Sequence, residues 1–443
     1  MKPTIALIGR PNVGKSTLFN RLTKSQSAIV MDEPGITRDR QIGEGRVGDR
    51  PYWVVDTGGF EANATDMVDQ QRIQQTLRAV DEANAVIVLL DAKTGLTIQD
   101  QVLSEQLRTS HARVFLVVNK AEGMSQALAT AEFHELGLGQ PYAISATHGD
   151  YVSDLMELIL ENFPPVETVT SASKHPILAI IGRPNTGKST LLNRIVGENR
   201  VITCDEPGTT RDSIFVDVTY HDHHYTLIDT AGIRRKGRIV QTVEKCSIFR
   251  TLRAMDTAHV ALLMLDAREG IADQDCAIAN LALQAGCALV IAVNKWDGMD
   301  TYQQQVIKRS IAQKLAFLNF VRLHYISALH GSGINAIFQS IDEAYLAATI
   351  KFSTPKLTKI LMNAVALQAP ARTGNIVPKP RYAHQGGNMP PTIIIHGNAL
   401  HRLSKHYMRF LEHRFRQAFK LMGTPLRVQY KSGRNPYHKA AKH

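Results

Sequence analysis

The amino-acid sequence predicts an α/β protein in which two doubly wound, mostly parallel sheets follow one another and a small α+β domain comes last. The first observation is an internal repeat, because residues 9–17 (GRPNVGKST) recur as residues 182–190 (GRPNTGKST). The second is an alternation of apolar segments of strand length with helical segments, which is typical of parallel sheets covered by helices. The third is a change in composition near residue 352, after which basic residues predominate. A chain of 443 residues is long enough for about three domains.

The repeat extends over whole domains. Four further pairs of segments recur in the same order, namely PGITRD (34–39) and PGTTRD (207–212), DTGG (56–59) and DTAG (229–232), Asn119-Lys120 and Asn294-Lys295, and Ser145-Ala146 and Ser327-Ala328. The offset is 173 residues for the first three motifs, then 175 and 182 for the last two. A constant offset that drifts only late indicates duplicated domains whose loops differ in length.

The expected elements can be placed along the chain. In the first repeat we expect strands at 5–8, 52–56, 85–91 and 114–119, with a helix over 16–22. Because these strands are almost wholly apolar, they are expected to lie buried in a parallel sheet. The C-terminal segment reads as a helix (357–367), a strand (391–396), a second helix (404–422) and a strand (426–430). The predicted domains are 1–165, 177–351 and 352–443, with a proline-bounded linker at 166–176.

Charge is distributed unevenly. The net charge is +11, yet residues 355–443 hold 16 lysines and arginines against one acidic residue, Glu412. This concentration favours a polyanionic partner for the C-terminal domain. No apolar stretch approaches the roughly 18 to 20 residues of a membrane span, and the first strand begins too early to leave room for a signal peptide. Four cysteines without paired spacing are expected to be reduced structural thiols of a cytosolic protein.

The motif Gly-x-x-x-x-Gly-Lys-Ser between a strand and a helix is a P-loop. Its glycines let backbone N–H groups converge on phosphate oxygens, at the positive end of the helix dipole. Lys15 and Lys188 would reach the β- and γ-phosphates, while the Ser16 and Ser189 hydroxyls would ligate Mg²⁺. Two such motifs in equivalent positions predict two nucleotide sites.

The base is indicated by residues 294–297 (NKWD). The Asp297 carboxylate can accept hydrogen bonds from both N1–H and the exocyclic amine of guanine, whereas adenine presents the opposite donor pattern. Asn294 can brace the loop, and the stem of Lys295 can lie along the base. Ser327-Ala328 follows at the right distance to offer a backbone N–H to the guanine carbonyl. The sequence therefore predicts GTP and GDP as ligands.

Together these motifs resemble the Der family, also called EngA, of tandem Era-like GTPases. The resemblance covers almost the whole chain and includes the C-terminal segments 382–384 (YAH), 395–397 (IHG) and 434–436 (RNP). It implies that Thr37 and Thr210 are the switch threonines that sense Mg²⁺ and the γ-phosphate. It also implies that Asp56 and Asp229 hold Mg²⁺ through water, and that the C-terminal domain has a KH-like fold.

The same resemblance supplies a full set of site residues. The catalytic residues implied are Lys15, Thr37, Gly59, Lys188, Thr210 and Gly232, where the two glycines contact the γ-phosphate by backbone N–H. The nucleotide-binding residues implied for the first site are Gly9, Arg10, Pro11, Asn12, Val13, Gly14, Lys15, Ser16, Thr17, Asp56, Thr57, Gly58, Gly59, Phe60, Asn119, Lys120, Glu122, Ser145 and Ala146. Those for the second are Gly182, Arg183, Pro184, Asn185, Thr186, Gly187, Lys188, Ser189, Thr190, Asp229, Thr230, Ala231, Gly232, Ile233, Asn294, Lys295, Asp297, Ser327 and Ala328.

Two departures from common GTPase patterns stand out. The first site reads NKAE (119–122), so Glu122 replaces the usual aspartate with a side chain one methylene longer. This is either a tolerated replacement or a cause of weaker, less selective guanine binding there. Phe60 and Ile233 stand where many small GTPases place a water-orienting glutamine.

Because an apolar side chain cannot orient water, hydrolysis needs another aid. Similar Era-like proteins use K⁺ with the P-loop asparagine as a ligand. Asn12 and Asn185 occupy that position, which predicts GTP hydrolysis stimulated by K⁺. The alternative is that both asparagines only brace the loop.

The C-terminal domain lacks the Gly-x-x-Gly loop with which KH domains clamp RNA. What is left is a positive surface that would bind phosphates with little sequence preference. Its expected members are Arg402, Lys405, Arg409, Arg414, Arg416, Lys420, Lys431, Arg434 and Lys439. The nearby histidines are expected to face solvent or RNA rather than a metal.

The family resemblance points to maturation of the large (50S) ribosomal subunit in a bacterial cytoplasm. Nucleotide-controlled contact with ribosomal RNA would be the mechanism, and a ribosome-associated monomer without membrane or DNA partners is expected. A tRNA-modification or other RNA-binding GTPase is the alternative. A membrane-associated signalling GTPase is disfavoured because the sequence has no anchor or lipidation signal.

Overall fold

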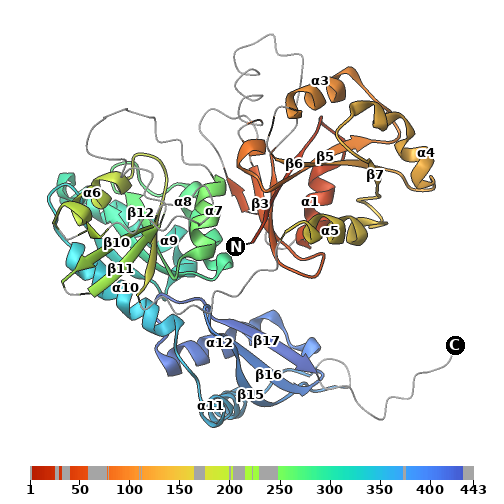
Figure 1. Ribbon diagram of the computed structural model, residues 1–443. Helices are drawn as coiled ribbons and strands as arrows, with labels where there is room; N and C mark the ends of the chain where they lie inside the picture. The colour runs from red at the N-terminus through yellow and green to blue at the C-terminus, as the bar shows by residue number, and fades with distance from the viewer. Residues whose placement is uncertain are drawn as a thin grey trace. The chain divides into compact units, whose positions relative to one another are not determined.

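A computed structural model describes most of the chain, and Figure 1 shows its elements. The residues described are 2–24, 29–31, 40–57, 77, 79–108, 110, 112–163, 175–198, 201–202, 215–221, 223–228, 248–372 and 376–432. The chain forms two compact units, of which one contains Met1–Ala172 with Cys246–Asp256 and the other Ser173–Lys245 with Thr257–His443. Nine of the eleven expected linker residues, 166–174, lie outside the described residues, and the predicted domain boundaries stay predictions.

The first unit is built on a seven-stranded sheet with the order β2-β3-β4-β1-β5-β6-β7. The strands are β1 (Thr4–Ile8), β2 (Ile29–Met31), β3 (Arg40–Gly45), β4 (Tyr52–Asp56), β5 (Ala85–Asp91), β6 (Arg113–Asn119) and β7 (Tyr142–Ala143). The helices are α1 (Lys15–Thr23), α3 (Ile98–Leu107), α4 (Gln126–Thr130), the 3₁₀ helix η1 (Ala131–Leu136) and α5 (Val152–Glu161). Strands β2 to β4 pair antiparallel, and the other neighbours pair parallel.

The second unit contains a sheet with the same topology, β9-β10-β11-β8-β12-β13-β14. The strands are β8 (Ile177–Ile181), β9 (Val201–Ile202), β10 (Phe215–Tyr220), β11 (His223–Ile228), β12 (Val260–Asp266), β13 (Ala288–Asn294) and β14 (Arg322–Tyr325). The helices are α6 (Lys188–Glu198), α8 (Asp273–Ala285), η2 (Trp296–Gly298), α9 (Thr301–Lys314), η3 (Ala316–Leu318) and α10 (Ile334–Ala348). Helix α7 (Ile248–Thr257) belongs to the first unit except for its last residue. The repeated topology confirms the predicted α/β fold class.

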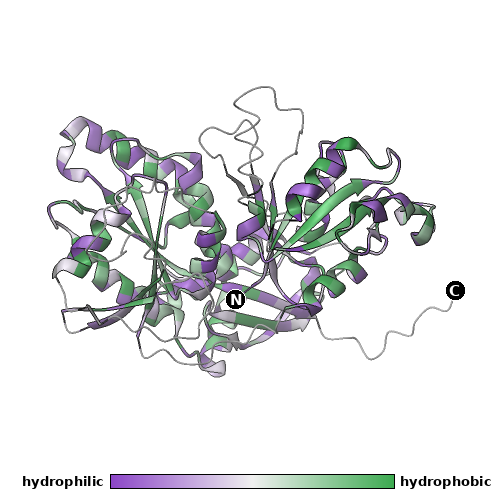
Figure 2. Ribbon diagram, turned by 45° about the horizontal axis from the view of Figure 1, so that its top comes forward, coloured by the Kyte–Doolittle hydropathy of each residue, from purple (hydrophilic) through white to green (hydrophobic). Residues whose placement is uncertain are grey.

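Burial follows the pattern of the sequence. Strand β5 reads AVIVLLD and is buried at every position, as a central parallel strand must be when helices cover both faces. In the first unit, α1 and α5 cover one face and share a core with alternate residues of β1, including Ile5 and Leu7. Figure 2 shows the corresponding colouring, with apolar strands inside and polar residues on the outer sides of the helices.

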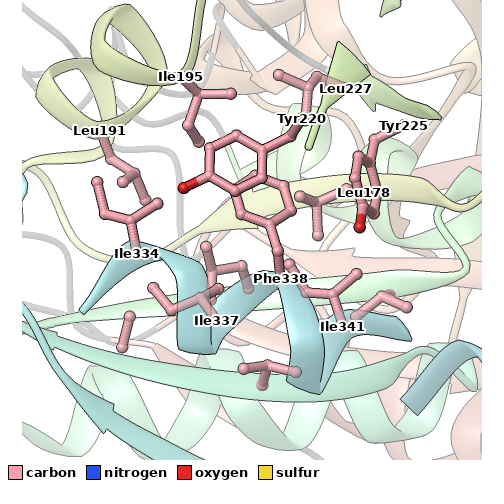
Figure 3. Close-up of a cluster of buried hydrophobic side chains, with 14 of the residues drawn as sticks. Leu178, Leu191, Ile195, Tyr220, Tyr225, Leu227, Ile334, Ile337, Phe338 and Ile341 are labelled. Carbon is pink, nitrogen blue, oxygen red and sulfur yellow. The ribbon is translucent and has the colours of Figure 1, made fainter. Parts of the chain in front are cut away.

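The second sheet has the equivalent core under α6 and α10, shown in Figure 3. Tyr220 stacks on Phe338 with ring centroids 4.0 Å apart and planes 17° from parallel. Leu191 and Ile195 approach from α6, and Ile341 continues the contact along α10. The two nucleotide motifs are therefore carried by equivalent, well-packed scaffolds.

The C-terminal domain belongs to the second unit and has a three-stranded sheet, β15-β16-β17. Its elements are α11 (Thr354–Leu367), β15 (Lys379–Gly387), β16 (Thr392–Asn398), η4 (Leu400–Arg402), α12 (Lys405–Phe419) and β17 (Arg427–Ser432). Strand β15 pairs antiparallel with β16, and β17 pairs parallel with it. Both expected helices and both expected strands are present, within a few residues of their predicted ends.

Strand β15 was not predicted. It reads KPRYAHQGG, with a proline and two glycines that ordinarily disfavour strands. It is an edge strand with two irregularities in its register, next to Pro380 and next to Gly387. Edge strands tolerate proline because one side of their backbone needs no partner.

Within the described part of the chain, every helix is too short or too polar to cross a membrane.

Candidate nucleotide-binding sites

Both candidate sites lie where parallel strands end at the same edge of a sheet. Strand β1 ends at Ile8 and leads through the P-loop into α1, while β5 and β6 end side by side with Asp91 opposite Asn119. In the second sheet Asp266 lies opposite Asn294 in the same way. Because parallel strands deliver their carboxyl ends to one edge, motifs more than a hundred residues apart meet there.

The P-loop and the base-reading loop are held together by one asparagine in each site. Asn119 donates from Nδ2 to the Val13 carbonyl at 2.8 Å and accepts at Oδ1 from the Ala146 N–H at 2.8 Å. Asn294 repeats this arrangement in the second site. The bracing role predicted for Asn294 is present in both sites. Each side-chain amide donates through its nitrogen to the P-loop and accepts at its oxygen from the Ser-Ala segment.

In the second site, Asn294 donates to the Thr186 carbonyl at 2.8 Å and accepts from the Ala328 N–H at 2.9 Å. Each asparagine side chain lies so close to a P-loop glycine that the glycine has no space for a side chain. A Cβ atom on Gly187 would lie 2.2 Å from Asn294 Nδ2, and one on Gly14 would lie 2.3 Å from Asn119 Nδ2. Both glycines also have positive φ, +93° and +101°.

The P-loop lysines lie over their own loops. Lys15 Nζ donates to the carbonyls of Gly9 at 2.9 Å and Arg10 at 2.7 Å, and Lys188 Nζ donates to the Arg183 carbonyl at 2.6 Å. The ammonium group is therefore held over the loop whose N–H groups would receive phosphate. The contact of both lysines with the β- and γ-phosphates stays a prediction.

The first site brings together two oxygen donors that suit Mg²⁺. The Ser16 hydroxyl donates to Asp56 Oδ2 at 3.1 Å, and a hydroxyl beside a carboxylate is the donor set that this hard cation prefers. Ser16 and Asp56 would hold the ion, which neutralises phosphate charge. Asp229, the counterpart of Asp56, lies outside the described residues.

The lysine of each base-reading loop is anchored rather than free. Lys120 Nζ donates to Asp91 Oδ2 at 2.6 Å and to the Asn12 carbonyl at 2.9 Å. Burial opposes ionisation of Asp91, but the bonds from Lys120 and from the Lys93 N–H outweigh it and lower its pKa. Lys295 makes the equivalent ion pair with Asp266. The stem of each lysine is thereby fixed beside the space for the base.

The base-reading carboxylates have different partners. Glu122 Oε1 lies 2.7 Å from Lys93 Nζ, and this bond lowers the pKa of Glu122. Asp297 is instead bonded by the Ser327 hydroxyl, which lowers its pKa, and His330 Nε2 lies 3.5 Å away. Both carboxylates are held in the charged form that can accept from guanine.

A cavity of about 440 Å³ adjoins the base-reading loop of the first site. Its lining residues come from that loop, from β7 and the turn after it, and from the start of α5: Ala121, Glu122, Gly123, Met124, Gln126, Ala143, Ile144, Ser145, Asp150, Tyr151 and Asp154. The lining includes Glu122 and Ser145 but none of Asn119, Lys120 and Ala146, so the cavity adjoins the predicted position of the base and does not coincide with it.

The P-loop arginines turn away from the phosphate position. Arg183 Nε donates to Asp275 Oδ1 at 2.8 Å, and the same guanidinium bonds Glu269 and the Gly270 carbonyl. Arg10 makes a looser version, with its Nε 3.4 Å from Asp100 Oδ2. Their side chains tie the P-loop to α8 and α3, so any nucleotide contact they make would come from the backbone.

Other predicted residues lie near these groups or outside the described residues. Asn12 and Asn185 have positive φ, +66° and +63°, and the Thr57 hydroxyl donates to the Leu7 carbonyl at 2.9 Å. The predicted residues that lie outside the described part are Thr37, Gly58, Gly59, Phe60, Thr210, Asp229, Thr230, Ala231, Gly232 and Ile233. The assignment of individual ligand contacts stays a prediction.

Two pairs of residues were missed by sequence reasoning. They are Asp91 with Lys93 in the first site and Asp266 with Arg268 in the second, which contact or face the base-reading loops. The signal was present, because DAK (91–93) and DAR (266–268) follow apolar strands with the same 175-residue offset as the NK pairs.

The expected basic surface of the C-terminal domain needs one correction. Arg416 is largely buried, donates to Glu412 Oε1 at 3.0 Å, and places its guanidinium 3.8 Å from the centre of the Phe320 ring. Burial lowers its pKa. Arg416 therefore joins the C-terminal domain to the second GTP-site domain rather than facing a partner. Arg434 and Lys439 lie outside the described residues.

Comparisons with known proteins agree with these sites. A family model described as a 50S ribosome-binding GTPase matches residues 4–120 and again 177–295. A model described as the KH-domain-like C-terminal part of EngA bacterial GTPase enzymes matches residues 351–431. The two matches to the first model contain both P-loops and end at Lys120 and Lys295, the second residues of the two base-reading loops.

Curated relatives are similar over nearly the full length. GTPase Der of Chromobacterium violaceum is 57% identical over 437 residues, covering 99% of this chain and 93% of its own. GTPase Der of Nitrosospira multiformis is 56% identical, with 99% and 94% covered. The solved G domain of the T. maritima FeoB iron transporter is 25% identical and covers 36% of this chain and 98% of its own, but its TM-score of 0.30 is too low to support an inference.

Proposed function

This chain belongs to the GTPase Der family, with two GTPase domains that bind and hydrolyse GTP, and from that premise we propose that it controls assembly of the large ribosomal subunit. In this proposal the two nucleotide sites set when the KH-like domain contacts ribosomal RNA. Hydrolysis then releases the protein from the subunit.

The observation that carries the proposal is the direct link between the basic domain and a strand of the second site. The Leu289 N–H donates to the Gly423 carbonyl at 2.6 Å, and the Gly423 N–H donates to the Phe320 carbonyl at 2.7 Å. Leu289 lies in β13, the strand that ends at Asn294 in the base-reading loop. A shift in that loop would therefore reach the RNA-binding domain through one strand.

The charge of the C-terminal domain supports RNA as the partner. Residues 355–443 carry 16 basic residues and one acid, and that acid, Glu412, is paired with Arg416. A surface with so few carboxylates attracts phosphate by counterion release, and the attraction weakens as salt rises.

The test is co-sedimentation of the purified protein with isolated 50S and 30S subunits. We expect retention by the 50S subunit to differ by about fivefold or more between a non-hydrolysable GTP analogue and GDP, a typical allosteric coupling. A double variant, Lys15→Ala with Lys188→Ala, should abolish the difference because neither site can grip the phosphates. Failure to associate in every nucleotide state would overturn the proposal.

The rival is a GTPase that acts on tRNA. It predicts retention of tRNA rather than of 50S subunits in the same experiment, at the same salt concentration. The KH-like domain and its charge would suit either RNA, so the choice between them depends on which one follows the nucleotide state.

We also propose that K⁺ stimulates hydrolysis at both sites. Asn12 and Asn185 lie in the P-loops with positive φ, and Phe60 and Ile233 provide no group that can orient water. A cation beside the phosphates would supply the charge that an arginine finger supplies elsewhere. Ser16 and Asp56 in the first site, and Ser189 and Asp229 in the second, would hold Mg²⁺ separately, and Thr37 and Thr210 would join them with GTP.

Turnover in KCl and in NaCl at equal ionic strength tests the K⁺ proposal. We expect faster turnover in KCl, and we expect Asn185→Ala to remove most of the difference that the second site contributes. Equal rates in the two salts would overturn it.

The proposal also includes the domain boundaries at 165, 176 and 351. It further includes a monomeric protein that associates with ribosomes in a bacterial cytoplasm.

A further inference from the structure

Three aromatic rings lie together on the outer face of the C-terminal sheet. Tyr382 of β15 stacks on His396 of β16 with centroids 4.6 Å apart and planes 2° from parallel. His384 lies 5.0 Å from His396 at an angle of 23°. The sequence shows these residues only as parts of two separate motifs, YAH and IHG, and the pairing of Tyr382 with His396 across the strands brings them together.

This face is the one turned away from the domain core. Ala383 and Ile395, which neighbour the rings in the chain, are fully buried in the core under α11 and α12. Successive residues of a strand point to opposite sides, so Tyr382, His384 and His396 point outward. Tyr382 is 47% exposed although it is a large aromatic residue. Packing of the core therefore does not explain the cluster.

The surroundings of the rings are positive. Lys431 of β17 lies directly opposite His396 in the sheet and is exposed. Lys379 of β15 is also exposed and lies opposite Asn398, two residues beyond His396. The domain's single acid, Glu412, lies on α12 and bonds Arg416. Burial, with help from the charges of His384 and Lys431, lowers the pKa of His396. Its ring is thus a neutral, flat surface at neutral pH.

We propose that the outer face of β15, β16 and β17 binds unpaired RNA bases, which stack on Tyr382 and His396 while Lys431 and Lys379 contact the flanking phosphates. This rests on the proposed function, since it specifies how the KH-like domain holds RNA. It differs from the binding predicted from the sequence, which used only positive charges and no aromatic ring. Duplex RNA cannot use this surface, because its bases are stacked on one another.

Stacking and charge make separable predictions. A base stacked on an aromatic side chain is worth about 1–3 kcal/mol, which corresponds to about 5- to 150-fold in affinity. Replacing the Tyr382 ring should therefore weaken binding without changing its dependence on salt. Replacing Lys431 should instead reduce the salt slope by about one phosphate contact.

The experiment uses the full-length protein with single-stranded RNA that contains 2-aminopurine, and with a duplex of the same length. Tyr382→Leu should weaken single-strand binding about tenfold and remove the quenching of 2-aminopurine that stacking causes, while Tyr382→Phe should restore both. Tyr302→Leu is the matched control, because Tyr302 lies on α9 and is 76% exposed. GTP turnover and melting temperature should be unchanged by Tyr382→Leu.

The outcomes separate this inference from the proposed function. If Tyr382→Leu and Lys431→Gln bind RNA and 50S subunits like the unaltered protein, the stacking surface is wrong and the ribosomal function stands. If duplex and single strand lose affinity equally, stacking is also wrong. If Tyr382→Leu changes only the sedimentation of the protein itself, the face joins two copies of the chain. If the unaltered protein binds neither RNA nor 50S subunits, both proposals fail.

Discussion

The two nucleotide sites have the same strand order and the same asparagine brace, but they hold the base-reading carboxylate differently. In the first site Glu122 is paired with a cation, Lys93, at 2.7 Å. In the second, Asp297 is bonded by the neutral Ser327 hydroxyl, and His330 is 3.5 Å away. Ser145 bonds Glu122 as Ser327 bonds Asp297, so the sites differ in the ammonium group of Lys93, with which guanine must compete in the first site.

The arginines beneath the P-loops differ in the same direction. Arg183 makes a 2.8 Å bond to Asp275 and also bonds Glu269 and the Gly270 carbonyl. Arg10 lies 3.4 Å from Asp100 and bonds the Gly95 carbonyl at 3.2 Å. The second site is the more firmly constructed of the two in both features. The P-loop geometry is thus the same in the two sites, whereas the partners of the base-reading carboxylates and the ion pairs of the P-loop arginines differ. We therefore expect the second site to bind guanine nucleotides more selectively.

The largest expected effect comes from the P-loop lysines. Lys188→Ala should lower the turnover of the second site about 10²- to 10³-fold, because this is the usual cost of removing one hydrogen-bond donor that stabilises charge in a transition state. The turnover that is left then belongs to the first site. Lys15→Ala gives the converse measurement, so steady-state GTP hydrolysis by the two variants ranks the sites directly. Equal rates of GTP hydrolysis by the two variants would contradict a difference in activity between the sites.

Loss of the arginine brace should come next. Arg183→Met leaves the buried Asp275 carboxylate without its cation and should cost about 3 kcal/mol in the free energy of unfolding. Burial already raises the pKa of Asp275 despite the Arg183 bond, and the variant should raise it further. Arg10→Met is the matched control, with a smaller loss expected from its looser ion pair.

The sign of the pH dependence follows from that raised pKa. Between the unfolded value of about 3.9 and the raised folded value, only the folded state keeps the proton, so stability falls as pH rises through this interval. The loss in the free energy of unfolding caused by Arg183→Met should therefore be larger at pH 8 than at pH 5, as measured by chemical denaturation. A deficit that does not vary with pH would show that Asp275 is not its source.

Removal of the base-reading charges should have a smaller and unequal effect. Asp297→Asn should weaken GDP binding at the second site about 100-fold, because a charged hydrogen bond is worth about 1.5–3 kcal/mol. Glu122→Gln should weaken the first site only about tenfold, since Lys93 already engages that carboxylate. Titration calorimetry resolves the two sites, and Asp273→Asn, at a surface carboxylate, serves as the control. Equal losses would remove the distinction between the sites.

The smallest effect concerns Lys93 itself. Lys93→Met should strengthen guanine binding at the first site by about fivefold or less, because an exposed ion pair is worth only about 0–1 kcal/mol. Arg268→Met, the counterpart in the second site, should bring no such gain. A loss of affinity in Lys93→Met would mean that the lysine assists the nucleotide instead of competing with it.

Much of the fold could be read from the sequence because the strands are long and apolar. The strand 85–91 was predicted with the bounds that β5 has, and the strand 52–56 with those of β4. Strand β15 escaped prediction because its polar residues, proline and glycines have low strand propensity, and only pairing with β16 makes it a strand. The exposed position predicted for Arg416 was wrong because the sequence does not show that Phe320 lies beside it.

The sequence by itself determined that there are two P-loops, two guanine-reading loops and a basic end, because each depends on residue types at short spacing. Only the tertiary structure decided that Lys93 pairs with Glu122, that Asn119 joins Val13 to Ala146, and that Tyr382 meets His396. These contacts join separate strands and loops, and no local pattern specifies them. They arise because strand pairing brings distant residues to the same edge or face of a sheet.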